Sequence, residues 1–98
     1  MTSRRPLVAA NWKMNGTLHG IRTLSADLRA GLQGVNRTDV AICPPFPYLA
    51  ELQDALAGSV IVLGAQNLSE YEAGAYTGEV SGAMLRDYNC SVVIVGHS

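Results

Sequence analysis

Polar side chains follow three apolar runs of the sequence, and their types suit a site that binds a small anion. The runs cover residues 7–10, 60–65 and 92–95, and the polar residues that come after them are Asn11, Lys13, Gln66, Asn67 and His97. An ammonium group attracts negative charge, and an imidazole can hold a proton on one ring nitrogen while accepting one on the other. With hydrogen-bonding amides beside them, these groups could hold an anionic substrate and move a proton.

Each of these residues also has a plain structural interpretation. Lys13 could be a solvated loop lysine, Asn11 could be a turn former before the Asn15-Gly16 turn, and a lone histidine such as His97 is usually structural. Their shared position favours a site. All of them stand where an apolar strand ends, and ligands of α/β proteins bind at the carboxyl ends of parallel strands.

Four strands must position these side chains. Apolar runs predict the strands at residues 7–10, 40–43, 60–65 and 92–95. The first run is short and wholly apolar, which indicates a buried strand. The near-continuous apolarity of the third run is typical of a strand covered on both faces in a parallel sheet. Pro44 and Pro45 must end the second strand, because proline cannot donate to the hydrogen-bond ladder.

Three helices are predicted between the strands. The first is capped by Thr17 and ended by Gly34, the second runs from Pro47 to Gly58, and the third is short and capped by Ser81. Their apolar faces are Leu18, Ile21, Leu24, Leu28 and Leu32 in the first, Leu49, Leu52 and Leu56 in the second, and Met84, Leu85 and Tyr88 in the third. His19 lies near the start of the first helix and is predicted to lie on the surface.

Residues 67–80 form a long polar stretch punctuated by glycines. Loops of this length inside a compact domain are usually functional. The alternative is a surface excursion without a partner. Two tyrosines, Tyr71 and Tyr76, stand among the glycines and favour a shaped protrusion that docks on another surface.

Alternating strands and helices predict an α/β fold, with a parallel sheet and right-handed crossovers, in a single partial domain over residues 1–98. The pattern alone does not separate an open doubly wound sheet from part of a closed barrel.

A net charge of −1 gives no reason to expect nucleic acid or a membrane surface, and no apolar run is long enough to cross a bilayer or to act as a signal peptide. Cys43 and Cys90 lack the spacing of metal ligands, so we expect two buried thiols in a reducing cytoplasm and no metal.

Five ordered motifs resemble those of the triosephosphate isomerase family. They are Ala9–Gly16, Cys43-Pro44-Pro45, Gly64–Asn67, Gly74–Glu79 and Val95–Ser98. The resemblance covers nearly the whole chain but only about two-fifths of such a barrel, which typically runs to ~250 residues. It implies that the (βα)n chain is the amino-terminal half of a TIM (β/α)8 barrel. Only four of eight strands would be present, so we do not expect this chain to close a barrel by itself.

The resemblance also implies an activity and roles for individual residues. The activity is interconversion of dihydroxyacetone phosphate and glyceraldehyde 3-phosphate through an enediolate, without metal or cofactor. Lys13 would attract the substrate phosphate and the developing negative charge, Asn11 would hydrogen-bond a substrate oxygen, and His97 would be the neutral electrophile. The family's loop at residues 67–80 implies a homodimer. The roles implied at that interface belong to Thr77 as the tip that reaches the partner subunit, with Gln66 and Glu79 as support.

The family's carboxylate base, its lid and its main phosphate-binding loops lie after the position that matches Ser98. Glu70, Glu72 and Glu79 are the nearest carboxylates, and nothing in the sequence places them against a substrate. We therefore expect the 98-residue chain alone to be inactive. Whether it is a piece of a longer protein, a cleavage product or one half of a split barrel stays open. The alternative function is a non-catalytic half-barrel that binds a phosphorylated ligand or assembles with a complementary chain.

Overall fold

The sheet consists of four parallel strands in the order of the sequence. The computed structural model describes residues 5–97, and its strands are β1 (Leu7–Asn11), β2 (Asp39–Cys43), β3 (Ile61–Ala65) and β4 (Cys90–Val93). Neighbours pair in the order β1-β2-β3-β4, each parallel to the next. The predicted α/β class and parallel sheet are confirmed, and all four carboxyl ends lie at the same edge.

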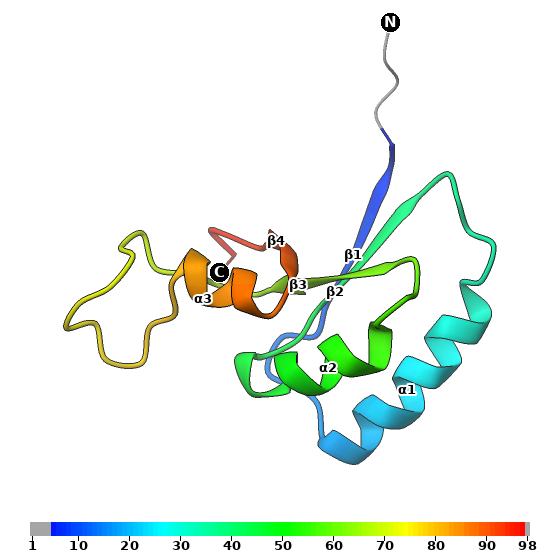
Figure 1. Cartoon of the computed structure of the whole chain (residues 1–98), viewed down its shortest axis with the longest axis horizontal. Coiled ribbons are helices and arrows are strands. Elements are labelled where there is room, and N and C mark those ends of the chain that lie inside the picture. The colour runs from blue at the N-terminus through cyan, green and yellow to red at the C-terminus, as the bar shows by residue number, and fades with distance from the viewer. Residues whose placement is uncertain (1–4, 98) are drawn as a thin grey trace, which may run out of the picture.

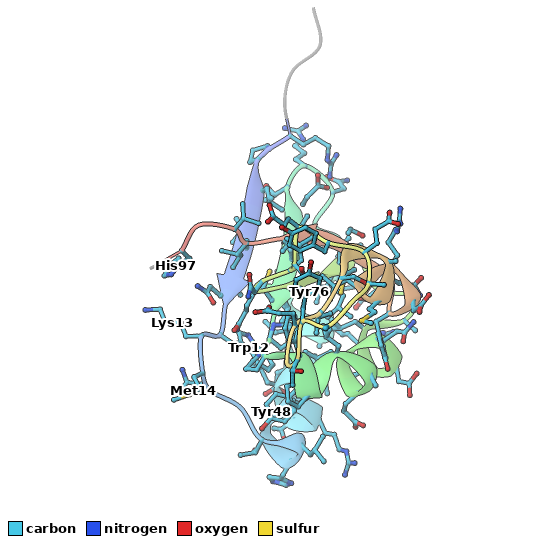
Figure 2. The ribbon with its side chains drawn as sticks, turned by 90° about the vertical axis from the view of Figure 1, so that its left-hand side faces the viewer. Trp12, Lys13, Met14, Tyr48, Tyr76 and His97 are labelled. Atoms are coloured by element: carbon cyan, nitrogen blue, oxygen red, sulfur yellow. The ribbon has the colours of Figure 1, made fainter. Side chains whose placement is uncertain are left out.

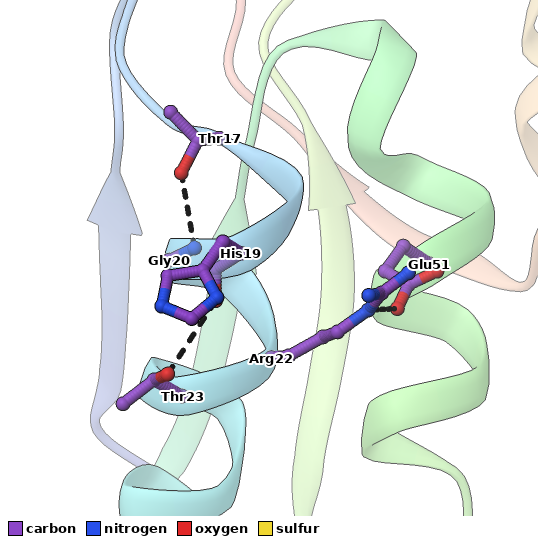
Figure 3. A network of polar contacts seen from close by, with 6 residues as sticks. All are labelled: Thr17, His19, Gly20, Arg22, Thr23 and Glu51. Atoms are coloured by element: carbon purple, nitrogen blue, oxygen red, sulfur yellow. Dashed lines mark hydrogen bonds and ion pairs between the residues drawn. The ribbon is translucent and has the colours of Figure 1, made fainter.

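The helices lie together on one side of this sheet (Figures 1 and 2). Helix α1 (Leu18–Gly31) packs against α2 (Leu49–Leu56), a 3₁₀ turn η1 (Phe46–Tyr48) leads into α2, and the short α3 (Gly82–Asp87) packs beside β4. An ion pair joins the two longer helices, with Arg22 Nε 2.7 Å from Glu51 Oε1 (Figure 3). The hydrogen bond to Glu51, and then its charge, raise the pKa of Arg22.

The hydrophobic core fills the space between the helices and the sheet. Its buried members are Ile21, Ile42, Leu49, Leu52, Leu56, Ile61, Leu63, Ala65 and Leu85. Every strand but β1 and each of the three α-helices contributes at least one side chain to this core or packs against it. Burying one such aliphatic side chain is worth about 1.5–3 kcal/mol, so the sheet is held to its helices mainly by this layer.

The predicted helix caps are confirmed, but one predicted stop is wrong. Thr17 Oγ1 accepts from Gly20 N at 3.0 Å (Figure 3), and Ser81 Oγ accepts from Met84 N at 3.2 Å. Helix α1 ends at Gly31 and not at Gly34. Gly34 lies in the turn beyond the helix, where it supplies a positive φ of 89° that other residues avoid.

The apolar face of α1 is narrower than predicted. Ile21 is buried and Leu28 and Leu32 pack against the core, but Leu18 and Leu24 are exposed. Ser25 is buried in their place. The positions of α1 that face α2 and the sheet are the ones that are buried. The spacing of apolar residues in the sequence does not show which of them those positions are. The face predicted for α2 is buried throughout, whereas in α3 only Leu85 is buried and Met84 and Tyr88 are exposed.

Strand β1 is not buried, contrary to the prediction. Leu7 and Val8 are 53% and 57% exposed. The cause is position in the sheet, since β1 pairs only with β2 within residues 5–97 and forms one edge. An apolar run indicates a strand that other elements can bury, but its burial depends on which elements pack against it.

Strand β4 lies two residues earlier than the predicted run at residues 92–95. The ladder shifts between β3 and β4, because Leu63 pairs with Cys90 while Gly64 pairs with Val92. Strand β4 ends at Val93, which pairs with Ala65, the last residue of β3, and Val95 is 68% exposed. Within the described part of the chain, no helix combines the length and apolarity needed to cross a membrane.

Candidate active site

A depression of about 370 Å³ lies at the carboxyl edge of the sheet. Its lining residues are Asn11, Lys13, Met14, Gln66, Ile94 and His97. The structure thus brings together four of the five side chains that the sequence predicted for a site, at or after the ends of β1, β3 and β4, whereas Asn67 is exposed and does not line the depression. Figure 2 shows that Lys13 and His97 extend on the side of the sheet away from the helices. An imidazole, an ammonium and two amides therefore border one open space.

The backbone of Lys13 is held in an unusual conformation. Its φ is +56°, in the left-handed region, which costs a residue with a Cβ roughly 1–2 kcal/mol. Both of its peptide groups are bonded, because Lys13 N donates to Asn11 Oδ1 at 2.9 Å and Gln66 Nε2 donates to the Lys13 carbonyl at 2.8 Å. These bonds hold Lys13 in its strained backbone conformation beside the depression. Residues with a strained backbone cluster at functional sites of proteins.

The side-chain amides of Gln66 and Asn11 make different contacts. Gln66 Nε2 also donates to the Cys43 carbonyl at 2.9 Å, so it joins the carboxyl ends of β2 and β3 to the loop after β1. Asn11 uses its Oδ1 in the turn to Lys13. Its Nδ2 donates to no group among residues 5–97, and it lines the depression, so it is free to donate to a ligand.

The far half of the loop is held by two further hydrogen bonds. Asn15 Nδ2 donates to the Trp12 carbonyl at 2.9 Å, and Tyr48 Oη donates to the Gly16 carbonyl at 2.9 Å. Sequence reasoning missed Tyr48, which stands 32 residues after its partner and carries no local signal of that contact.

His97 stands four residues beyond β4 and is exposed. The segment that leads to it is fixed to the sheet, since Ile94 N donates to the Ala65 carbonyl at 2.9 Å. The sequence predicted His97 just past the end of a strand over residues 92–95. In the structure β4 ends earlier, so His97 lies on a short extension from the sheet.

Thr77 and Glu79 do not join the depression. Both are exposed on the loop of residues 67–80, which projects from the sheet beside α3 (Figure 1). The loop is closed at its base, because Ser69 N donates to the Val80 carbonyl at 2.7 Å and Ser69 bridges Ser81. The predicted shaped protrusion is thus present, and Gln66, which precedes it in the chain, lines the depression.

Neither a carboxylate base nor a metal site is formed by the residues described. Glu70, Glu72 and Glu79 are exposed on the projecting loop, and none of them lines the depression. Across residues 5–97, no group of three or more His, Cys, Asp or Glu side chains is placed to hold a metal ion.

The two thiols differ in burial. Cys43 is fully buried, whereas Cys90 is only half-buried, and neither is in a disulfide. Burial raises the pKa of Cys43, and burial together with the charge of Cys43 raises the pKa of Cys90. Both thiols are therefore kept neutral, and the prediction of two buried thiols holds fully for Cys43 only.

A parallel βα sheet with polar side chains at the carboxyl ends of its strands defines an α/β fold of the barrel or doubly wound class, in which ligands bind at that edge. The profile of the family described as "Triosephosphate isomerase" matches residues 6–98. The chain belongs to the triosephosphate isomerase family, whose fold is the TIM barrel, and it corresponds to the amino-terminal part of that fold.

Individual relatives give the same result. The triosephosphate isomerase of Thiobacillus denitrificans is 56% identical over 95 residues, which are 97% of this chain and 37% of that protein. The enzyme of Nitrosococcus oceani is 53% identical, covering 97% of this chain and 38% of that protein. That of Coxiella burnetii is 50% identical, covering 97% and 37%. The chain therefore spans well under half the length of these relatives.

Proposed function

We propose that the protein to which this chain belongs is a triosephosphate isomerase that interconverts dihydroxyacetone phosphate and glyceraldehyde 3-phosphate. The observation that carries the proposal is the depression shared by Asn11, Lys13 and His97. Membership of the family supports it. The reaction belongs to glycolysis and gluconeogenesis, and we place the protein in the cytoplasm.

Each side chain has a role that its chemistry suits. The Lys13 ammonium attracts the substrate phosphate and stabilises the negative charge that develops on the enediolate. Asn11 Nδ2 donates to a substrate oxygen. His97 acts as the neutral electrophile, polarising the carbonyl through a ring N–H and carrying a proton between the two substrate oxygens. No step in this scheme requires a metal or an organic cofactor.

Abstraction of the proton from carbon needs a base, and we assign it to residues outside 5–97. The depression is lined by no carboxylate among the residues described. A positioned base is worth roughly 10²- to 10⁴-fold in rate. A lid and further phosphate contacts add orientation and exclusion of water. The 98-residue chain alone is therefore expected not to isomerise substrate at an enzymatic rate.

The partner in the proposed assembly is a second copy. The loop of residues 67–80 projects from the fold and carries Thr77 at an exposed position. In the proposed homodimer this residue reaches toward Asn11 and Lys13 of the other subunit, and Glu79 and Gln66 support the contact. A second candidate is an assembly module that pairs with a complementary chain, which the exposed apolar strand β1 favours.

The decisive experiment removes the Lys13 charge in the complete enzyme. Lys13 is the only lysine of the sequence, so Lys13→Ala removes one specific ammonium. The matched control is Arg37→Ala, which removes an equal charge from an exposed loop before β2. Lys13→Ala should lower kcat/KM by at least about 100-fold, or about 2.7 kcal/mol, and Arg37→Ala should leave it unchanged. Near-normal kcat/KM in Lys13→Ala would overturn the assignment.

The same assay tests whether the isomerase activity needs residues outside this chain. The purified 98-residue chain is measured alone and after addition of the remaining segment of a relative, with a Lys13→Ala copy as the control for contaminating enzyme. Activity that appears only on mixing supports the isomerase and an assembling half-barrel together. Robust turnover by the chain alone, lost in the Lys13→Ala copy, would contradict the assignment of the base to other residues.

A further inference from the structure

We propose that Tyr48 is a positioning residue for Lys13, acting through the loop of residues 12–16. This inference rests on the proposed function, because it concerns how the site's cation is held. Tyr48 belongs to η1, the turn that follows β2, whereas the loop follows β1. It does not line the depression itself. Any effect it has on the chemistry must therefore pass through the backbone.

The contact between Tyr48 and Gly16 has two parts. The hydroxyl of Tyr48 donates to the Gly16 carbonyl at 2.9 Å. The ring lies close to the glycine, since a Cβ built on Gly16 would stand 3.0 Å from Tyr48 Cε2. Gly16 has a φ of +130°, a conformation that L side chains rarely adopt. The hydrogen bond and the close approach together fix the end of the loop that is farther from the sheet.

Every other anchor of the loop lies nearer to the sheet. Trp12 N donates to the Cys43 carbonyl at 3.1 Å, and the peptide groups of Lys13 are held by Asn11 and Gln66. Asn15 bonds only to Trp12, within the loop itself. Without Tyr48 the loop would keep its first half tied and lose the one tertiary hydrogen bond recorded for its second half within residues 5–97.

Lys13 needs anchors on both sides because its backbone is strained. A residue at φ +56° returns to an ordinary conformation unless its neighbours prevent it. Releasing Gly16 allows the backbone of residues 13–16 to relax, and the Lys13 ammonium then moves away from the depression. A hydrogen bond of this kind is worth a factor of about 3 to 10 in an equilibrium. We expect the fraction of molecules in which Lys13 lies at the depression to fall by the same factor.

The test uses Tyr48→Phe in the complete enzyme, because phenylalanine keeps the ring and removes only the hydroxyl. The matched control is Tyr88→Phe. Tyr88 is exposed at the end of α3, and its hydroxyl makes no hydrogen bond within the described part of the chain. Tyr48→Phe should raise KM about three- to tenfold with a smaller change in kcat, since Lys13 binds the substrate phosphate. Tyr88→Phe should change neither.

Hydrogen exchange gives a readout that does not depend on activity. The amide of Lys13 donates to Asn11 Oδ1, so Tyr48→Phe should speed its exchange several-fold while the amide of Ile42 in β2 stays protected. Unchanged exchange at Lys13 and unchanged KM would overturn the role of Tyr48. Equal acceleration at Lys13 and Ile42 would also overturn it, because that result marks a general loss of stability.

The two proposals fail in different ways. If Lys13→Ala keeps its activity, the proposed function of Lys13 fails, whereas exchange at the Lys13 amide still reports whether Tyr48 holds the loop. If Lys13→Ala is inactive and Tyr48→Phe leaves both KM and exchange unchanged, only the inference about Tyr48 fails.

Discussion

The rings of Tyr71 and Tyr76 stack in parallel, with their centroids 4.5 Å apart and their planes within 3°. Both residues belong to the projecting loop of residues 67–80, so the loop is braced by its own side chains. The stack spans the loop above the closure at Ser69 and Val80. A loop that is ordered before it docks loses less conformational entropy on binding.

Removing this stack should loosen the loop and little else. Tyr71→Ala should speed limited proteolysis between residues 67 and 80 by about two- to tenfold, because a stacked aromatic pair is worth about 0.5–1.5 kcal/mol beyond its buried area. Tyr71→Phe keeps the ring and should behave like the wild type. If Tyr71→Phe is cleaved as fast as Tyr71→Ala, the ring contact is not what orders the loop.

The same loop provides the test of the proposed homodimer. Thr77→Arg places a bulky charge at an exposed position of the loop and should shift the complete enzyme toward monomer in sedimentation at low micromolar concentration. Uncompensated burial of a charge at an interface is strongly unfavourable. Ala30→Arg adds the same side chain to an exposed position of α1 and should leave the dimer intact. An unchanged dimer in Thr77→Arg would give this loop another role.

The strain at Lys13 should appear in stability measurements. Lys13→Gly should be more stable than Lys13→Ala by about 1 kcal/mol, because only glycine adopts a φ of +56° without a steric cost. Chemical denaturation of the two variants gives the difference directly, and both lack the ammonium. Equal stabilities would mean that the loop relaxes when the lysine side chain is removed.

Gly64 should not tolerate a methyl group. A Cβ at this position would lie 2.6 Å from both Cys43 Sγ and Val92 Cγ2, and overpacking of this kind costs about 1–3 kcal/mol. Gly64→Ala should therefore lower the free energy of unfolding by that amount. The control, Gly31→Ala, places its Cβ where nothing lies within 4 Å. Adding Cys43→Ala to Gly64→Ala should restore part of the loss, and a double variant no more stable than Gly64→Ala would place the clash at Val92 alone.

Burial of Cys43 gives the protein a pH dependence above neutrality. Because its pKa is raised in the folded state, the unfolded chain releases the thiol proton at a lower pH. The resulting stability is fully present below the ordinary thiol pKa of about 8.5 and is lost as the pH rises toward the folded value. Denaturation of the wild type and of Cys43→Ala between about pH 7 and about pH 10 should show the steeper loss in the wild type. Parallel curves would mean that Cys43 titrates alike in both states.

Local patterns predicted the elements that depend on neighbouring residues. The caps at Thr17 and Ser81, the buried face of α2 and the parallel order of the strands follow from spacing and residue type. The grouping of Asn11, Lys13 and His97 was predictable for the same reason. Each stands shortly after an apolar run, and parallel strands bring such positions to one edge.

Contacts between distant segments were beyond the same reasoning. The end of β4 depends on its pairing with β3, which stops at Ala65 opposite Val93, and no residue pattern marks that pairing or the shift between Leu63 and Gly64. The bonds from Gln66 to two carbonyls of other segments, and from Tyr48 to Gly16, join residues 23 to 53 positions apart. Exposure of β1 likewise depends on what packs beside it, which its own sequence does not contain.

The left-handed backbone at Lys13 limits how this position can change during evolution. Glycine, asparagine and aspartate fit that conformation most readily, and none of them carries a positive charge. Arginine keeps the charge and pays the same backbone cost, but its broad, forked head does not replace a compact ammonium. A lineage that keeps the charge therefore has no stepwise route to a relaxed residue at position 13. Relief of the strain must come from neighbours such as Asn11 and Gln66, which ties their variation to this single lysine.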